Sequence, residues 1–176
     1  MADCLVGAFA ARECFATLIS PHVSALFETA NALSGDSAAG QELLLDTLDR
    51  ALRRFARGPV PGDLRLWLFG QLAATYRSPL RHVAGWLRRA MHYGPSESLP
   101  LPLATTRREA AQAQEALLGL PRHLRAALVL RDVSGFSYAQ MAEILRWPHR
   151  LVAQRVAAGR RRLVRLLWAN GHCALG

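Results

Sequence analysis

The feature that most limits the fold is a proline-rich stretch, GPSESLPLPL (residues 94–103), which interrupts an otherwise helical pattern. It holds three prolines and no apolar repeat of helical period. Proline lacks the backbone N–H that a helix needs, and its ring crowds the preceding turn, so no regular helix crosses this segment. Extended at roughly 3 Å per residue, the segment is long enough to separate two domains by tens of ångströms. The sequence therefore predicts two helical domains joined by a flexible linker.

On the N-terminal side of this stretch, apolar residues recur at helical spacing. The pattern predicts helices over about 8–19, 23–33, 37–57 and 64–76, with a turn-rich segment over 31–37. Pro21 suits a helix start, and Ser37 or Asp36 and then Asp63 suit N-caps. Pro79 predicts a kink or break, because it removes an N–H and crowds the carbonyl of Thr75.

On the C-terminal side, the same spacing predicts four helices, over about 106–118, 121–132, 137–145 and 148–168. No long run of the chain alternates with period two, and Ala, Leu and Arg abound, which favours helices. We therefore predict an all-α protein with domains over 1–93 and 106–170. The linker spans 94–105, and 171–176 form a tail.

The positive charge is concentrated at the C-terminal end. All 22 basic residues are arginines, and the formal net charge is +9. Residues 121–176 hold ten arginines against Asp132 and Glu143, whereas residues 1–94 hold ten arginines against eight acids. Such a distribution indicates a polyanionic partner for the C-terminal domain. The alternative is an ordinary solvated helix face.

The segment SYAQMAEILRWPHRLVAQRV (137–156) has the pattern of a helix-turn-helix. Ser137 and Gln140 can form a capping box, Arg146 and Trp147 make the turn, and Pro148 opens the second helix. Its buried stripe is predicted at Val152, Val156, Leu163 and Leu166, and off the stripe lie His149, Arg150, Gln154, Arg161 and Arg165. This arrangement suits a recognition helix in the DNA major groove. An amphipathic helix pair in a bundle would show the same pattern.

A longer run carries a family resemblance. ALLGLPRHLRAALVLRDVSGFSYAQMAEIL (116–145), with Arg155 and GRRRL (159–163), resembles the C-terminal domain of bacterial sigma factors of the extracytoplasmic-function (ECF) class. In the N-terminal half, GQELLLDTLDRAL (40–52) is similar to the family helix that grips the polymerase clamp. LWLFG (66–70) is similar to the helix that melts the promoter and reads its opened upstream edge.

The resemblance implies a set of partners and site residues. The chain would bind core RNA polymerase through residues 40–52, and an anti-sigma factor would be its usual inhibitor. Promoter DNA would be read at the upstream element by His149, Arg150, Gln154 and Arg155, with phosphate contacts from Arg161 and Arg165. The downstream element would be engaged by Trp67, Arg77 and Arg81, and the polymerase by Glu42, Leu45, Asp46 and Asp49. Leu44 and Leu48 are expected in the core, whereas Leu45 could either face a partner or pack against a neighbouring helix.

Several positions depart from the family pattern. The usual Asp and Gln of the clamp-gripping motif are Glu42 and Leu45, and the usual Asn and Asp of the melting region fall at Ala74 and at Ser78–Pro79. In the recognition helix the usual Thr and Lys are Leu151 and Ala153, and the usual turn Gly is Arg146. A left-handed conformation at this arginine would cost on the order of 1 kcal/mol. The changes at Ala74 and Ser78–Pro79 predict weaker promoter opening than is typical of the family.

Other classes of function lack support in the sequence. We find no Ser-His-Asp or Cys-His arrangement, no Gly-rich phosphate loop and no metal-ligand spacing, so we expect no enzyme activity, cofactor, metal or small-molecule substrate. Neither a signal peptide nor a bilayer span is predicted, and Cys4, Cys14 and Cys173 fit reduced thiols of a cytoplasmic protein. Two alternatives remain: a sigma-like decoy that binds an anti-sigma factor without initiating transcription, and a stand-alone helix-turn-helix regulator whose N-terminal half dimerises or senses a signal.

Overall fold

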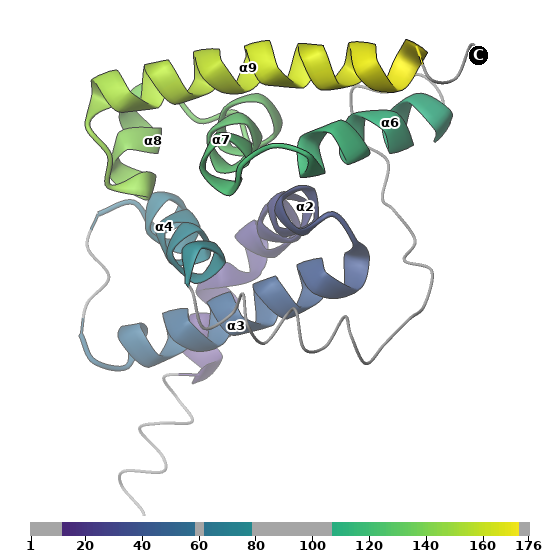
Figure 1. The fold of residues 1–176 in the computed structure, drawn as a ribbon. Coiled ribbons are helices and arrows are strands. Elements are labelled where there is room, and N and C mark those ends of the chain that lie inside the picture. Colours follow the sequence, from purple (N-terminus) through teal and green to yellow (C-terminus); the bar gives the residue numbers. More distant parts are fainter. Residues whose placement is uncertain (1–11, 59–61, 79–106, 173–176) are drawn as a thin grey trace, which may run out of the picture.

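The computed structural model describes residues 12–58, 62–78 and 107–172, and the elements in these ranges are helices (Figure 1). The N-terminal half, up to residue 78, holds a helix over 12–19, the 3₁₀ turn η1 (Ser20–His22), α2 (Val23–Ser34), α3 (Ser37–Phe55) and α4 (Leu64–Arg77). The C-terminal half, from residue 107, holds α6 (Arg107–Leu118), α7 (Arg122–Leu128), the π-helix η2 (Val129–Val133), α8 (Tyr138–Leu145) and α9 (His149–His172). The predicted all-α class is confirmed. The predicted linker lies outside the described residues.

Local sequence signals position the helix starts as predicted. The Asp36 carboxylate accepts a hydrogen bond from the N–H of Ala39 (2.7 Å) and caps α3. Asp63 caps α4 by accepting from the N–H groups of Arg65 (2.7 Å) and Leu66 (3.2 Å). Such caps satisfy backbone donors that have no partner in the first helical turn. At its other end, α4 stops at Arg77, just before the Ser78–Pro79 pair, as the predicted break requires.

Three predicted boundaries were wrong. Helix α2 continues through Ser34, because the left-handed residue that ends it is Gly35 (φ 93°), so most of the segment predicted as a turn is helical. The helix predicted over 121–132 changes to a π-helix at Val129, where the N–H of Ser134 reaches the carbonyl of Val129 (2.9 Å). Helix α9 runs to His172, past both its predicted end and the predicted start of the tail.

The buried stripe of α3 is rotated from the one predicted. Leu43 and Thr47 are fully buried, whereas Leu44 and Leu48 are half-buried at the edge of the core. Thr47 tolerates burial because its hydroxyl donates to the carbonyl of Leu43 (2.6 Å). The stripe follows from the close crossing of α2 and α3 at Gly40, where an added Cβ would lie 1.8 Å from the Asn31 side-chain oxygen.

The two halves share one core. In Figure 1, α2, α3 and α4 form a lower layer, and α6, α7, α8 and α9 cover it from above. A single cluster of buried apolar side chains runs through both layers. At its centre the ring of Phe69 on α4 meets the ring of Phe136 edge-on, with centroids 4.7 Å apart. Burying a side chain of this size contributes roughly 1.5–3 kcal/mol. The described halves are therefore in direct contact.

Candidate nucleic-acid interface

The helix-turn-helix is built by α8, α9 and the turn between them. Ser137 and Gln140 form the predicted capping box: the N–H of Gln140 donates to the Ser137 hydroxyl (3.2 Å), and the N–H of Ser137 donates to the Gln140 amide oxygen (2.9 Å). Most inward residues of the two helices are buried as predicted: Met141, Ile144, Leu145, Val152 and Val156. Leu163 and Leu166, predicted on the same stripe, are half-buried against the core. Packing on both helices fixes the direction in which the outer face of α9 points.

The turn contains the backbone strain that the sequence predicted. Arg146 adopts a left-handed conformation (φ 53°, ψ 45°) and is the one non-glycine residue with positive φ in the described part of the chain. Its N–H donates toward the last carbonyls of α8, and the N–H of Trp147 donates to the carbonyl of Ala142 (3.0 Å). These bonds hold a conformation that costs an L-residue about 1 kcal/mol.

The turn also orients one of the predicted DNA contacts. The Arg155 guanidinium lies 5.4 Å from the ring centre of Trp147, within the range of a cation–π interaction, and Arg155 is half-buried. Burial and the nearby Arg155 charge lower the pKa of His123 on α7. Arg155 is therefore held against the turn, and its motion is restricted.

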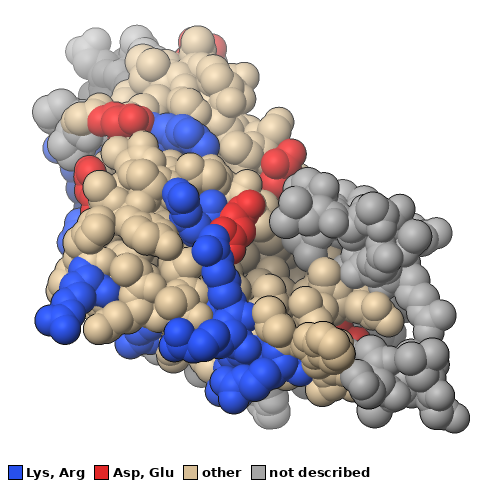
Figure 2. Space-filling model, turned by 90° about the horizontal axis from the view of Figure 1, so that it is seen from above, with Lys and Arg blue, Asp and Glu red and all other residues tan. Residues whose placement is uncertain are grey.

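The other predicted DNA contacts of α9 lie on its outer face. His149, Arg150, Gln154, Arg161 and Arg165 are all exposed. Seen from this side, blue arginine side chains form a band across the molecule with few acidic groups among them (Figure 2). One acid that does approach α9 is Asp132, which pairs with Arg160 (2.5 Å). The face combines a bidentate amide near the helix start with arginines further along, which suits base contacts and phosphate contacts respectively.

The four residues predicted to contact polymerase lie along one side of α3. Glu42 lies three residues from Leu45 and four from Asp46, and Asp49 lies four from Leu45 and three from Asp46, which places the four on one broad helix face. Leu45 is 65% exposed, so of the two alternatives for this residue the structure shows the outward one. Asp46 and Asp49 are also exposed, Glu42 is half-buried, and Asp49 pairs with Arg53 one turn later. The result is an exposed leucine flanked by carboxylates.

The residues predicted to engage the downstream element make more contacts with the rest of the protein than those on the outer face of α9 do. Trp67 is half-buried, and the Arg77 guanidinium donates to the carbonyls of Ala73 (3.2 Å) and of Leu145 at the end of α8 (2.9 Å). Burial, together with the charge of Arg146, lowers the pKa of Arg77. Arg81 lies outside the described residues. Helix α4 thus packs against α8, while Arg77 itself remains exposed.

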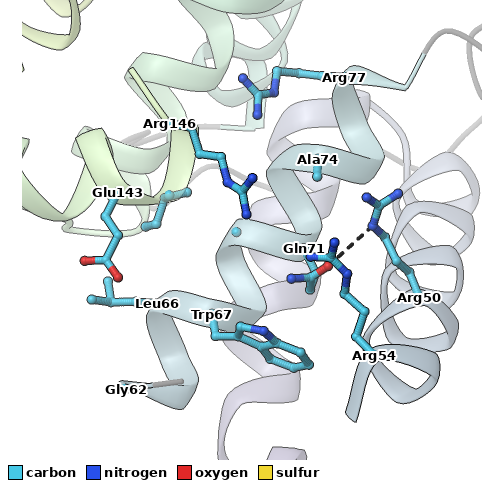
Figure 3. A pocket seen from close by; sticks show the side chains of 12 residues that line it. Arg50, Arg54, Gly62, Leu66, Trp67, Gln71, Ala74, Arg77, Glu143 and Arg146 are labelled. Atoms are coloured by element: carbon cyan, nitrogen blue, oxygen red, sulfur yellow. Dashed lines mark hydrogen bonds between the residues drawn. The ribbon is translucent and has the colours of Figure 1, made fainter. Parts of the chain in front are cut away.

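A hollow of about 430 Å³ lies where α3, α4 and α8 meet. Figure 3 shows Arg146 reaching toward α4 from one side, Arg50 and Arg54 of α3 from the other, and the Trp67 ring below. The Arg50 guanidinium donates to the Gln71 side chain (3.4 Å). Sequence reasoning missed this group of arginines. The spacing of Arg50 and Arg54 predicts a shared helix face, but no local signal places Arg146 opposite them.

The described residues contain no group of His, Cys, Asp and Glu suited to a metal ion. Among the same residues, no helix is both long and apolar enough to cross a membrane.

Known proteins share both the motif and most of the chain. Residues 110–163, which include α8, the turn and α9 as far as Leu163, match the family model described as Sigma-70, region 4. The chain is 31% identical over 149 residues to the ECF RNA polymerase sigma factor EcfG of Rhodopseudomonas palustris (strain TIE-1). That alignment covers 85% of this chain and 82% of the relative.

Two solved structures resemble the whole arrangement. The sigma factor RpoE, solved in complex with the anti-sigma factor NepR from Bartonella quintana, superposes with a TM-score of 0.68 at 25% identity, covering 88% of this chain and 97% of that one. CnrH, solved in complex with the cytosolic domain of CnrY, gives a TM-score of 0.63 at 23% identity, covering 96% and 99% of the two chains. The second likeness concerns the fold alone.

Proposed function

Because the chain belongs to the extracytoplasmic-function class of RNA polymerase sigma factors, we propose that it binds core polymerase and directs it to promoters through the outer face of α9. The observation that carries this proposal is the exposed, basic face of a capped helix-turn-helix inside the region matched to Sigma-70 region 4. As a sigma factor it supplies recognition and leaves the chemistry of RNA synthesis to polymerase.

The reading of the upstream element is assigned to four residues near the start of α9. The Gln154 amide can pair bidentately with an adenine edge, and Arg150 and Arg155 with guanine. The stack of Arg155 on Trp147 restricts that guanidinium before DNA arrives, which favours one orientation over the groove. His149 begins the helix beside them. Arg161 and Arg165 lie further along, where phosphate contacts would fix the register.

The polymerase contact is assigned to the exposed face of α3. Leu45 with Glu42, Asp46 and Asp49 gives an apolar centre surrounded by negative charge. Such a surface fits a partner that is basic around an apolar pocket, because opposite charges steer the approach and the buried leucine contributes most of the affinity. Trp67, Arg77 and Arg81 are assigned to the downstream element, which polymerase opens.

An inhibitory protein partner is part of the proposal. RpoE was solved with the anti-sigma factor NepR, and CnrH with part of CnrY. We assign a partner of this kind to the present chain. We also assign the domain division at the proline-rich segment, with 1–93 as the polymerase-binding part, 94–105 as linker and 106–170 as the DNA-reading part. Because polymerase is cytoplasmic, we place the protein there.

Sequence selection by the holoenzyme tests the proposal. Core polymerase of the host bacterium, with and without the protein, is mixed with a pool of duplex fragments from its intergenic DNA, and bound fragments are sequenced. The expected result is enrichment of a shared upstream motif only when the protein is present, with a changed motif for Gln154→Ala. No enrichment beyond core polymerase alone would contradict the proposal. Tight binding to an anti-sigma protein in that case would support the decoy alternative.

A further inference from the structure

Four arginines line the hollow of about 430 Å³ where α3, α4 and α8 meet, which we call the junction hollow. Arg50 and Arg54 lie on its α3 side, Arg77 lies at the end of α4, and Arg146 reaches toward it from the turn after α8 (Figure 3). The arginines come from three separate segments of the chain, so the fold and not a run of basic residues brings their charges together.

Little negative charge balances these arginines. Of the described residues that line the junction hollow, Glu143 alone is acidic, and Figure 3 shows its carboxylate on the opposite side from Arg50 and Arg54. Within the described part of the chain, none of the four arginines forms an ion pair with a carboxylate. Arg50 donates to the Gln71 side chain, and Arg77 donates to two main-chain carbonyls. The hollow therefore carries a net positive charge.

The positive charges also act on one another. Burial lowers the pKa of Arg77, and the like charge of Arg146 lowers it further. Arg54 and Arg146 are exposed, so their guanidinium groups are accessible to a ligand that enters the hollow. An anion between the arginines would offset this repulsion, because a nearby opposite charge favours the charged form of each group.

The arrangement suits a di- or triphosphate group better than a nucleic-acid strand. Guanidinium groups pair bidentately with phosphate oxygens, and several of them can bind one triphosphate because its charges lie on adjacent groups. A single strand carries its charges spread along its length, and its binding sites are grooves that follow the backbone. Arg50, Arg54 and Arg146 instead border one hollow from two sides.

Trp67 provides a surface for the base of a nucleotide. Its ring borders the junction hollow below the arginines in Figure 3 and is half-buried. Every nucleobase can stack on an aromatic ring, whatever its sequence identity. One turn further along α4, a Cβ added to Gly70 would meet no atom within 4 Å, so the space beside this face of the helix is open. The volume of the hollow also falls within the range of about 300–1,000 Å³ that is usual for small-molecule sites.

We propose that the junction hollow binds a nucleoside triphosphate, whose phosphates pair with Arg50, Arg54 and Arg146 and whose base stacks on Trp67. The site is separate from the outer face of α9 and from the exposed side of α3, so nucleotide binding requires neither promoter DNA nor polymerase. The bound phosphates connect α3 with the turn after α8. A nucleotide therefore stabilises the folded protein by an amount that grows with its concentration relative to its Kd.

Isothermal titration calorimetry of the full chain at constant ionic strength tests the proposal, with GTP, ATP, tripolyphosphate and inorganic phosphate as ligands. GTP and ATP should each bind with a stoichiometry of about one, and at least about fivefold more tightly than tripolyphosphate, because only nucleotides can stack on the ring. Inorganic phosphate should bind at least about tenfold more weakly than tripolyphosphate, since it contacts fewer guanidinium groups. Absence of nucleotide binding at millimolar concentration would overturn the proposal, and so would equal affinities for tripolyphosphate and GTP.

Substitutions distinguish the junction hollow from the basic face of α9. Arg54→Gln and Arg146→Gln should each weaken GTP binding at least about tenfold, because each removes charge-assisted hydrogen bonds to phosphate. Arg53→Gln, next to Arg54 but outside the hollow, is the matched single-charge control. Arg161→Gln with Arg165→Gln removes two exposed charges of α9 and should change GTP affinity by less than about twofold, since solvent and salt screen distant charges. Loss of GTP binding in the α9 variant but not in the hollow variants would contradict the proposal.

Trp67→Leu separates a nucleotide site from a site for phosphate alone. It should lower the affinity for GTP to about that for tripolyphosphate, whose own affinity should change by less than about twofold because it does not stack. Retained tripolyphosphate binding also shows that the variant is folded.

A short oligothymidine strand is the last ligand to be compared, because Trp67 and Arg77 are also assigned to the downstream element. The strand should bind the free protein more weakly than GTP does, and GTP binding should persist in its presence. Suppose instead that the strand binds through Arg54 and Arg146 while free nucleotides do not bind. The hollow would then belong to the downstream-element site, and the nucleotide proposal would be wrong. Failure of promoter selection by the holoenzyme would contradict the proposed function without changing these titrations.

Discussion

The outer face of α9 and the helix α4 are both assigned to promoter DNA, yet they differ in how far they are exposed to solvent. On α9, Gln154 and Arg150 are exposed, whereas half of the residues of α4 are buried and Trp67 is half-buried. Arg77 is exposed, but its guanidinium donates to the carbonyl of Leu145 at the end of α8. One surface is presented before any partner arrives, and the other is occupied by the protein itself. The comparison therefore separates a surface that is presented to solvent from a helix that packs against the other half of the protein.

The largest predicted effect concerns the shared core. Phe69→Ala removes the ring that packs on Phe136 and should lower the free energy of unfolding by about 3–5 kcal/mol. Urea unfolding followed by circular dichroism measures it, and wild type should unfold in one transition because the core is continuous. Val164→Ala, at a position 52% exposed, should change stability by less than about 0.5 kcal/mol. Two separate wild-type transitions would show that the halves are energetically independent.

The next effect is on polymerase binding. Leu45→Glu places a charge at the apolar centre of the α3 face and should cost at least about 2 kcal/mol in affinity, or roughly thirtyfold. Asp46→Arg should act in the same direction. Both are measured by pull-down with core polymerase, and duplex DNA binding by α9 should be unchanged. Leu18→Glu, an exposed leucine elsewhere in the same half, is the matched control. An equal loss of polymerase affinity in Leu18→Glu would contradict the assignment of polymerase binding to the exposed face of α3.

Substitutions on the outer face of α9 should distinguish base contacts from phosphate contacts. Gln154→Ala should weaken binding to the selected promoter by about 1–3 kcal/mol and relax its sequence preference. Arg161→Ala should weaken binding to all sequences alike and reduce the slope of affinity against salt by about one. Fluorescence anisotropy on matched and scrambled duplexes at several salt concentrations measures both. Identical behaviour of the two variants would mean that α9 does not enter the groove in this orientation.

The smallest effect concerns the turn. Arg146→Gly relieves a left-handed arginine and should raise the free energy of unfolding by about 1 kcal/mol. The same change at Arg162, inside α9, should lower stability by about 1 kcal/mol, because glycine is a poor helix former. Destabilisation by both substitutions would show that the Arg146 side chain, which lines the junction hollow, stabilises the fold more than its backbone strains it.

The features that could be predicted from the sequence are those that depend on residues close together in the chain. The caps at Asp36, Asp63 and Ser137 follow from short-range hydrogen bonding. The left-handed turn at Arg146 was expected from the family resemblance, which has a glycine at this position. The buried side of α9 followed from its period. These features need no knowledge of the rest of the molecule.

Contacts between distant parts were not predictable in the same way. Arg77 and its acceptor Leu145 are 68 residues apart, and Thr29 and Ser134, whose hydroxyls are hydrogen-bonded, are 105 apart. The stripe of α3 was misplaced because the close crossing of α2 and α3 at Gly40 sets it. The exposure of Leu45 had two equal sequence interpretations, which only tertiary packing separates.

In vitro transcription with core polymerase tests the central claim most directly, namely that this chain initiates transcription by reading DNA with α9. Purified core polymerase, the protein and a linear template carrying the selected promoter should give a defined run-off transcript. Gln154→Ala should lower its yield roughly tenfold, in line with a binding loss of 1–3 kcal/mol. Transcript that depends on the protein and falls with Gln154→Ala is the predicted result. A protein that binds core polymerase and this duplex yet yields no transcript in either form would contradict the account.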